Sequence, residues 1–95
     1  MNNYEVMYII RPDLDEEATN AVVERFSSLI TANGGKVEDT DTWGKRKLAY
    51  PIEDYTEGYY VLCHFTADSQ LPKELERNFR ISDSILRYLV TRPEA

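Results

Sequence analysis

The chain has few of the residues that most often carry enzyme chemistry, with one cysteine and one histidine among its 95 residues. Cys63 cannot form an internal disulfide, and no group of cysteines and histidines has the spacing of a zinc site. Neighbouring side chains of an extended segment point to opposite faces, so Cys63 and His64 cannot act together. We therefore predict no metal, no cofactor and no catalytic site. Cys63 is interpreted as a small buried hydrophobe, and His64 as an ordinary sheet residue.

Long apolar runs and phosphate-binding glycine loops are also missing. No segment approaches the ~20 apolar residues that are needed to cross a bilayer, and the N-terminus has no charged-then-apolar signal pattern. Gly34-Gly35 lacks the lysine and the serine or threonine of a phosphate loop. With 42% apolar and 29% charged residues, the chain is predicted to fold as one small domain over residues 1–95. We expect it to be cytoplasmic, without a membrane segment, and monomeric in isolation.

Basic residues are scarce, and the formal net charge is -6. Residues 1–42 hold nine acidic and three basic residues, whereas residues 43–95 hold eight of each. An acidic balance argues against indiscriminate nucleic-acid binding, which depends on cations that release phosphate counterions. The one basic run is Lys45, Arg46 and Lys47, in which Arg46 faces the opposite way from the two lysines. Two interpretations stay open for it: charge that protects a sheet edge, or contact with a ligand.

Apolar periodicity divides the chain into six elements. Period-two alternation predicts strands over residues 4–10, 36–52, 59–66 and 85–91. Spacing of three and four residues predicts one helix over about 15–32, and a second that follows a cap at Asp68 or Ser69 and ends near Arg80. Asp13 is expected to cap the first helix, because Glu16 follows three residues later. Residues 53–58 are expected to form a longer loop in an antiparallel hairpin.

This order of strand, helix, strand, strand, helix, strand predicts an α+β, ferredoxin-like fold. Two right-handed strand-helix-strand units share one four-stranded antiparallel sheet and place both helices on a single face. The opposite face is then uncovered, and its side chains are more apolar than solubility requires. This suggests a docking surface, unless the alternation is assigned to the wrong face or a loop covers it. Candidates for docking are Met7, Ile9, Tyr60, Leu62 and Leu89, and the same face is expected to carry Glu5, His64 and Arg87.

Features that suit nucleic acid are present but incomplete. Tyr59 and Tyr60 are similar to the aromatic pairs of sheets that stack bases, yet the octapeptide of the RNA recognition motif is not found. Arginines near the second helix and the last strand, among them Arg80 and Arg87, suit bidentate contact with phosphate. Arginine near a helix C-terminus also simply favours the helix dipole, so both interpretations stay open for Arg80.

Four segments carry a resemblance to a known family: Tyr4–Ile10, Trp43–Ile52, Gly58–Tyr60 and Arg77–Asp83. In this order and spacing they resemble the sixth protein of the bacterial small ribosomal subunit, over nearly the whole chain from Tyr4 to about Val90. The resemblance implies a ferredoxin-like protein without enzymatic activity. It also implies binding to the central domain of small-subunit ribosomal RNA, as a heterodimer with the eighteenth small-subunit protein.

The resemblance also points to contact residues. Carried over residue by residue, it implies that RNA or the partner is contacted by Lys45, Arg46, Lys47, Arg80 and Arg87. This chain departs from many members in having Asn2-Asn3 before the first tyrosine, where they are basic, and in stopping at Ala95 without a longer tail. An acidic protein with a basic strip and an apolar face is predicted to bind RNA weakly alone, and better once a basic partner covers that face.

Two other functions fit the same fold. A small-molecule regulatory module of this fold is expected to dimerise and to show a thermal shift with a metabolite. A phosphatase-like enzyme needs an arginine in a phosphate-cradling loop after the first strand. Arg11 lies there, but Pro12 and the acidic residues that follow it make a poor anion cradle. We favour the ribosomal interpretation over both.

Overall fold

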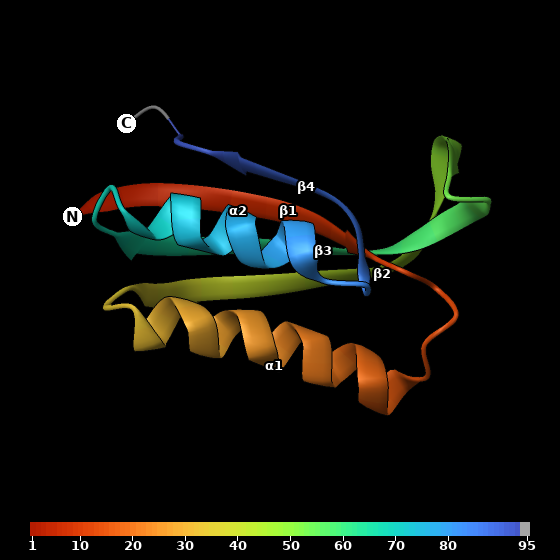
Figure 1. Ribbon diagram of the computed structural model, residues 1–95, viewed down its shortest axis with the longest axis horizontal. Coiled ribbons are helices and arrows are strands. Elements are labelled where there is room, and N and C mark those ends of the chain that lie inside the picture. The colour runs from red at the N-terminus through yellow and green to blue at the C-terminus, as the bar shows by residue number, and fades with distance from the viewer. Residues whose placement is uncertain (94–95) are drawn as a thin grey trace.

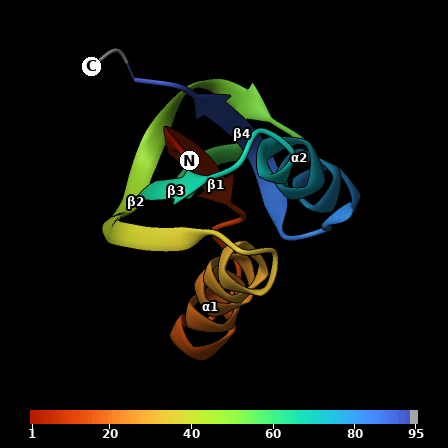
Figure 2. The same ribbon diagram turned by 90° about the vertical axis from the view of Figure 1, so that its left-hand side faces the viewer.

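The computed structural model describes residues 1–93, which form four strands and two helices in the predicted order (Figure 1). The elements are β1 (Asn2–Ile10), α1 (Glu16–Ala32), β2 (Lys36–Ile52), β3 (Tyr55–Ala67), α2 (Leu71–Ile81) and β4 (Ile85–Thr91). The strands lie in the order β2-β3-β1-β4, and every neighbouring pair is antiparallel. Both helices lie on one side of this sheet (Figure 2). The predicted ferredoxin-like fold is therefore confirmed.

The core lies between the helices and one face of the sheet. Alternate residues of β1, namely Tyr4, Val6, Tyr8 and Ile10, are buried there. At its centre an aromatic cluster joins both helices to the sheet, and Phe79 of α2 touches three other rings. The ring centroids of Phe79 lie 4.3 Å from Phe26, 5.0 Å from Tyr8 and 5.3 Å from Tyr88. Aromatic pairs at this spacing stabilise a fold beyond the apolar area that they bury.

Both helices begin differently from the sequence prediction. The N-cap of α1 is Asp15, whose Oδ1 accepts a hydrogen bond from Ala18 N at 2.8 Å, so the prediction of Asp13 is wrong. Asp13 instead pairs with Arg11, which removes it from the helix end. The N-cap of α2 is Gln70, which makes no capping bond through its side chain, so the prediction of Asp68 or Ser69 is also wrong. The Asp68 carboxylate instead accepts a hydrogen bond from the backbone N–H of Gln70, so it stabilises the turn before the helix.

The β2–β3 hairpin is tighter than predicted. A longer loop over residues 53–58 is wrong, because β3 already begins at Tyr55 and pairs there with Ile52. The turn consists of Glu53 and Asp54, with φ angles of 49° and 70°. Two successive residues with positive φ are typical of the turn whose twist matches that of an antiparallel hairpin.

The hairpin continues past the end of β1. The last pair of β1 joins Ile10 to Tyr59, whereas β2 and β3 go on pairing to their turn, so the tip projects from the sheet (Figure 1). The register of β2 shifts at three places along its length, between Val37 and Asp39, Thr42 and Gly44, and Lys47 and Ile52. Gly44 has a φ of 82°, which glycine adopts without steric cost. Such irregularities bend and twist a strand.

Candidate functional site

The open face is the face of the sheet that the helices leave uncovered. It carries the residues that alternate with the core positions of β1, β3 and β4, and a hollow on it is lined by Met7, Ile9, Arg87, Tyr88 and Leu89. Met7, Tyr60 and Leu62 are half-buried, and Leu89 is 64% exposed. Ile9 is buried, so it forms part of the floor of this surface. The structure thus brings the five predicted docking residues onto one face.

Arg46 lies at one end of the open face, on an aromatic stack. The ring of Trp43 is stacked with that of Tyr60, with centroids 6.4 Å apart and ring planes 11° apart. The guanidinium carbon of Arg46 lies 5.5 Å from the centroid of the Trp43 ring. A cation at this distance is attracted to the negative face of the ring. The aromatic stack therefore holds the arginine side chain at the sheet surface.

Arg87, on β4, is held in a similar way by the projecting hairpin. Its guanidinium carbon lies 5.2 Å from the Tyr50 ring centroid, and its Nη1 donates a hydrogen bond to the Tyr50 hydroxyl. Leu48, two residues before Tyr50, is buried near Gly58. A Cβ atom at Gly58 would overlap the Cγ2 atom of Ile9. The contact between Tyr50 and Arg87 therefore closes the hairpin onto one end of the open face. Glycine at position 58 leaves room for the Ile9 side chain.

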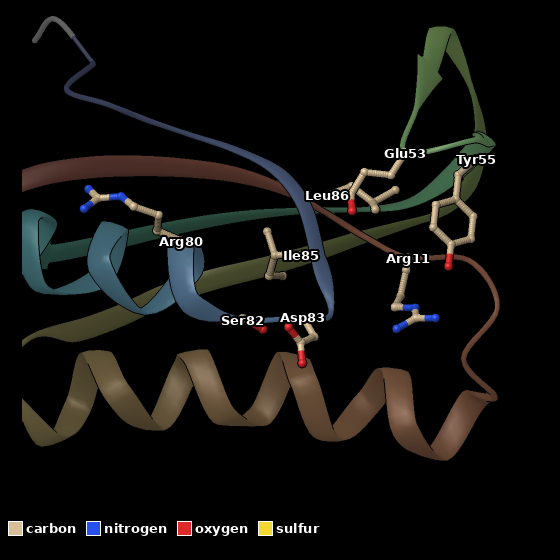
Figure 3. Close-up of a pocket in the computed structure, with 8 residues that line it drawn as sticks. All are labelled: Arg11, Glu53, Tyr55, Arg80, Ser82, Asp83, Ile85 and Leu86. Atoms are coloured by element: carbon tan, nitrogen blue, oxygen red, sulfur yellow. The ribbon is translucent and has the colours of Figure 1, made fainter.

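The other predicted cations lie elsewhere. Lys45 faces the helix side, in a hollow that it shares with Tyr59 and the start of α1. Lys47 is exposed, opposite Glu57 in the hairpin. Arg80 is exposed on α2, and Figure 3 shows its side chain pointing away from Arg11. Of the five predicted contact residues, only Arg46 and Arg87 share the open face.

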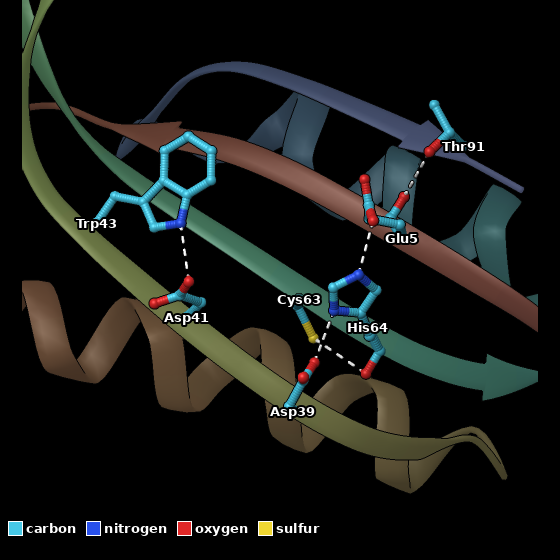
Figure 4. A network of polar contacts seen from close by, with 7 residues as sticks. All are labelled: Glu5, Asp39, Asp41, Trp43, Cys63, His64 and Thr91. Atoms are coloured by element: carbon cyan, nitrogen blue, oxygen red, sulfur yellow. Dashed lines mark hydrogen bonds and ion pairs between the residues drawn. The ribbon is translucent and has the colours of Figure 1, made fainter. Parts of the chain in front are cut away.

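The opposite end of the open face is acidic. Figure 4 shows His64 between Asp39 and Glu5, with its Nδ1 atom 2.7 Å from Asp39 Oδ1 and its Nε2 atom 2.6 Å from Glu5 Oε2. Both ring nitrogens face acceptors. The hydrogen bond to Asp39, and to a smaller extent the one to Glu5, raises the pKa of His64 above its ordinary value. Asp41, also on β2, accepts a hydrogen bond from the Trp43 indole nitrogen at 3.0 Å.

The cluster around His64 was not predicted from the sequence. Glu5, Asp39 and His64 come from three different strands, and they meet only through the strand register. The one available signal was that His64 and Glu5 were both expected on the open face, on different strands. Cys63 points to the other face and is buried as predicted, and burial raises the pKa of its thiol.

Arg11 lies at the rim of a polar hollow that is formed by the ends of several elements (Figure 3). Its guanidinium donates two hydrogen bonds of 2.7 Å to the Asp13 carboxylate, and the Tyr55 hydroxyl donates to the same carboxylate. The bonds from Arg11 hold the pKa of Asp13 below its ordinary value. Because an ionised carboxylate already neutralises Arg11, this site is poorly suited to cradle a phosphate group.

Within residues 1–93, no cluster of three or more histidine, cysteine, aspartate or glutamate residues is arranged to hold a metal ion. Neither α1 nor α2 is long and apolar enough to span a membrane. The open face combines an apolar strip with one basic and one acidic end.

Comparison with known proteins gives relatives over nearly the full chain. The family described as "Ribosomal protein S6" matches residues 3–92. A protein of Clostridium acetobutylicum named "Small ribosomal subunit protein bS6" is 60% identical over 90 residues, which cover 95% of each chain. A protein of the same name from Clostridium novyi is 54% identical over 94 residues, 99% of each chain. The crystal structure of 30S ribosomal protein S6 from Thermotoga maritima superposes with a TM-score of 0.93 at 35% identity, covering 97% of this chain and 87% of that one.

Proposed function

Because this chain belongs to the ribosomal protein S6 family, we propose that it binds the central domain of small-subunit ribosomal RNA together with the eighteenth small-subunit protein. As a member of this family it is a protein of the small ribosomal subunit, and RNA binding and a part in translation follow from that membership. The proposed role is structural and involves no catalysis. In isolation we propose a single monomeric domain.

The observation that carries the proposal is the uncovered face of the sheet. Leu89 is 64% exposed there, beside half-buried Met7 and Leu62, so an apolar strip lies open to solvent. An exposed apolar strip with a polar surround is typical of a surface that another macromolecule covers. The acidic residues at one end, Glu5 and Asp39, suit a basic protein partner.

The net charge of the chain supports the proposed dependence of RNA binding on a protein partner. With a formal net charge of -6, the chain repels RNA at long range, although it carries local cations. A basic protein on the open face lowers the net negative charge and adds cations beside those of this chain. RNA binding is therefore expected to depend on the partner.

The test is equilibrium binding of the purified chain to a central-domain ribosomal RNA fragment, with and without the eighteenth small-subunit protein, at two salt concentrations. We expect tight binding only with the partner, and weaker binding at the higher salt. Equal affinity with and without the partner would contradict the dependence on it. Absence of binding in both conditions would overturn the proposal and favour a metabolite-sensing module of the same fold.

A triple variant tests the basic run. Replacing Lys45, Arg46 and Lys47 by alanine is expected to weaken RNA binding and flatten its salt dependence. The free energy of unfolding should fall by less than about 1 kcal/mol, because exposed charges contribute little to stability. A control variant removes three cations from the helices, at Arg25, Lys73 and Arg77. An equal loss of RNA affinity in both triple variants would show a net-charge effect and would contradict the assignment of the basic run.

A further inference from the structure

Two pairs of arginines in this chain differ in whether a carboxylate lies beside them. Arg11 donates to Asp13, and Arg77 donates to Glu74 at 2.8 Å, so each of these cations is neutralised by a carboxylate. Arg46 and Arg87 lie instead on the rings of Trp43 and Tyr50. Within residues 1–93, no carboxylate oxygen lies within 4.0 Å of either guanidinium. In the described part of the chain, no neighbouring carboxylate therefore competes with an external anion for the two open-face arginines.

An aromatic ring orients a guanidinium without using up its capacity to bind an anion. The ring attracts the cation electrostatically and carries no charge that would offset it, so most N–H donors of the group stay available for a bidentate contact. Only one donor of Arg87 is used, by the Tyr50 hydroxyl. Holding a long side chain in place before binding also lowers the entropy that is lost on binding. Arg46 and Arg87 are thus prepared for an anionic ligand.

The strand register places both arginines toward the same end of the open face. Arg87 lies opposite Ile9, and Ile9 lies opposite Tyr60. Arg46 lies opposite Gly58, two residues before Tyr60 on β3. The carboxylates of Glu5 and Asp39 lie toward the other end, around His64. A polyanion is therefore attracted to the arginine end of the face and repelled from the acidic end.

We propose that Arg46 and Arg87 bind phosphate groups of the ribosomal RNA, and that Trp43 and Tyr50 are positioning residues that hold them. This inference rests on the proposed function and divides the open face. The arginine end takes RNA, and the apolar strip with the acidic end takes the basic protein partner. RNA fits the arginine end better than that partner does, because a basic protein meets like charge there.

The test measures how RNA affinity depends on salt, with the heterodimer as the binding species. Arg46→Gln and Arg87→Gln are each expected to weaken binding roughly tenfold, because each removes a charged hydrogen-bonding contact. Each should also reduce the slope of log affinity against log salt by about 0.7 to 0.9, the value for one lost phosphate contact. Arg25→Gln is the matched control, since Arg25 lies 5.9 Å from the Phe26 ring centroid on α1 and loses the same charge.

The positioning residues are tested by a different signature. Trp43→Leu and Tyr50→Leu keep both arginines but remove the rings that hold their side chains in place. The affinity for RNA should therefore fall about threefold to tenfold, while the slope of log affinity against log salt stays unchanged. Trp43→Phe restores a ring and should restore most of the affinity. A loss of affinity in Trp43→Phe equal to that in Trp43→Leu would contradict positioning by the ring.

Formation of the heterodimer without RNA separates the remaining outcomes. We expect Arg46→Gln and Arg87→Gln to form the heterodimer as the unaltered chain does. Weakened heterodimer formation with an unchanged salt slope for RNA would overturn the inference and assign the arginines to the protein partner. If the unaltered heterodimer binds RNA and the Arg46→Gln and Arg87→Gln variants bind it equally well, the inference is overturned but the proposed function stands. Failure of the unaltered chain to bind RNA with its partner would overturn the proposed function as well.

Discussion

Aromatic side chains have different roles on the two faces of the sheet. On the covered face, Tyr8, Phe26 and Phe79 contact one another and are almost fully buried. On the open face, Trp43 is 38% exposed, Tyr50 is 51% exposed, and each lies against an arginine. An aromatic ring therefore stabilises the fold on one face and orients a charge on the other. The difference depends on whether a helix covers the ring.

The largest effect is expected from breaking the covered face. Phe79→Ala removes the ring that touches Tyr8, Phe26 and Tyr88, and it leaves a cavity in the core. We expect the free energy of unfolding to fall by about 3–5 kcal/mol, as measured by urea denaturation. Leu89→Ala on the open face is the matched comparison, and it should cost less than about 1 kcal/mol. Similar losses in the two variants would contradict the contrast between the faces.

A smaller effect is expected where the open face is tightly packed. Gly58→Ala places a methyl group against Ile9 and Leu48, which should lower the free energy of unfolding by about 1–3 kcal/mol. Ile9→Ala removes the Cγ2 atom that this methyl group meets. In that background, Gly58→Ala should therefore cost less. Costs that simply add in the double variant would show that the overlap with Ile9 is not the cause.

The smallest effect is expected from the cluster around His64. Contacts with Asp39 and Glu5 raise the pKa of His64 above its unfolded value near 6.5. The stabilisation is therefore fully present below about pH 6.5 and is lost as the pH rises through the higher folded-state pKa. His64→Gln should lower the free energy of unfolding at pH 5.5 by less than about 1 kcal/mol, because the cluster is exposed to solvent.

At pH 9 this difference between His64→Gln and the unaltered chain should disappear. The double variant Glu5→Gln, Asp39→Asn removes both carboxylate charges beside His64, so His64→Gln should have no pH-dependent effect in that background. Urea denaturation at the two pH values measures both expectations. A difference that is equal at pH 5.5 and pH 9 would contradict the assignment of charge to His64.

The fold could be predicted from the sequence because its signals are local and repeated. Tyr4, Val6, Tyr8 and Ile10 occupy every second position and face the core, and this single pattern predicted both a strand and the face it buries. Asn33 and Gly34 predicted the end of α1, and Gly34 has a φ of 87° there. When a pattern repeats over several residues, one misassigned residue does not change the predicted element. The order of the elements and the identity of the open face were therefore predictable.

The errors concern features that one or two residues decide. Asp13 and Asp15 both have an acceptor near the start of α1, and the pairing of Asp13 with Arg11 and Tyr55 decides between them. The turn at Glu53 and Asp54 carries no glycine or asparagine, so its positive φ angles left no signal in the sequence. The contact of Arg87 with Tyr50 joins residues 37 positions apart. Such contacts depend on the register of strands, which composition and periodicity do not give.

The shifts of register along β2 have a consequence for the chain before it meets any partner. β2 is an edge strand, and 17 residues of edge would offer a long template on which a second copy could add a strand. Three register shifts bend that template, and the charged side chains of Glu38, Asp39, Lys45 and Lys47 line it. Irregular, charged edges resist the growth of fibrils. We therefore expect the strand that carries Arg46 to hinder self-assembly of the newly made protein.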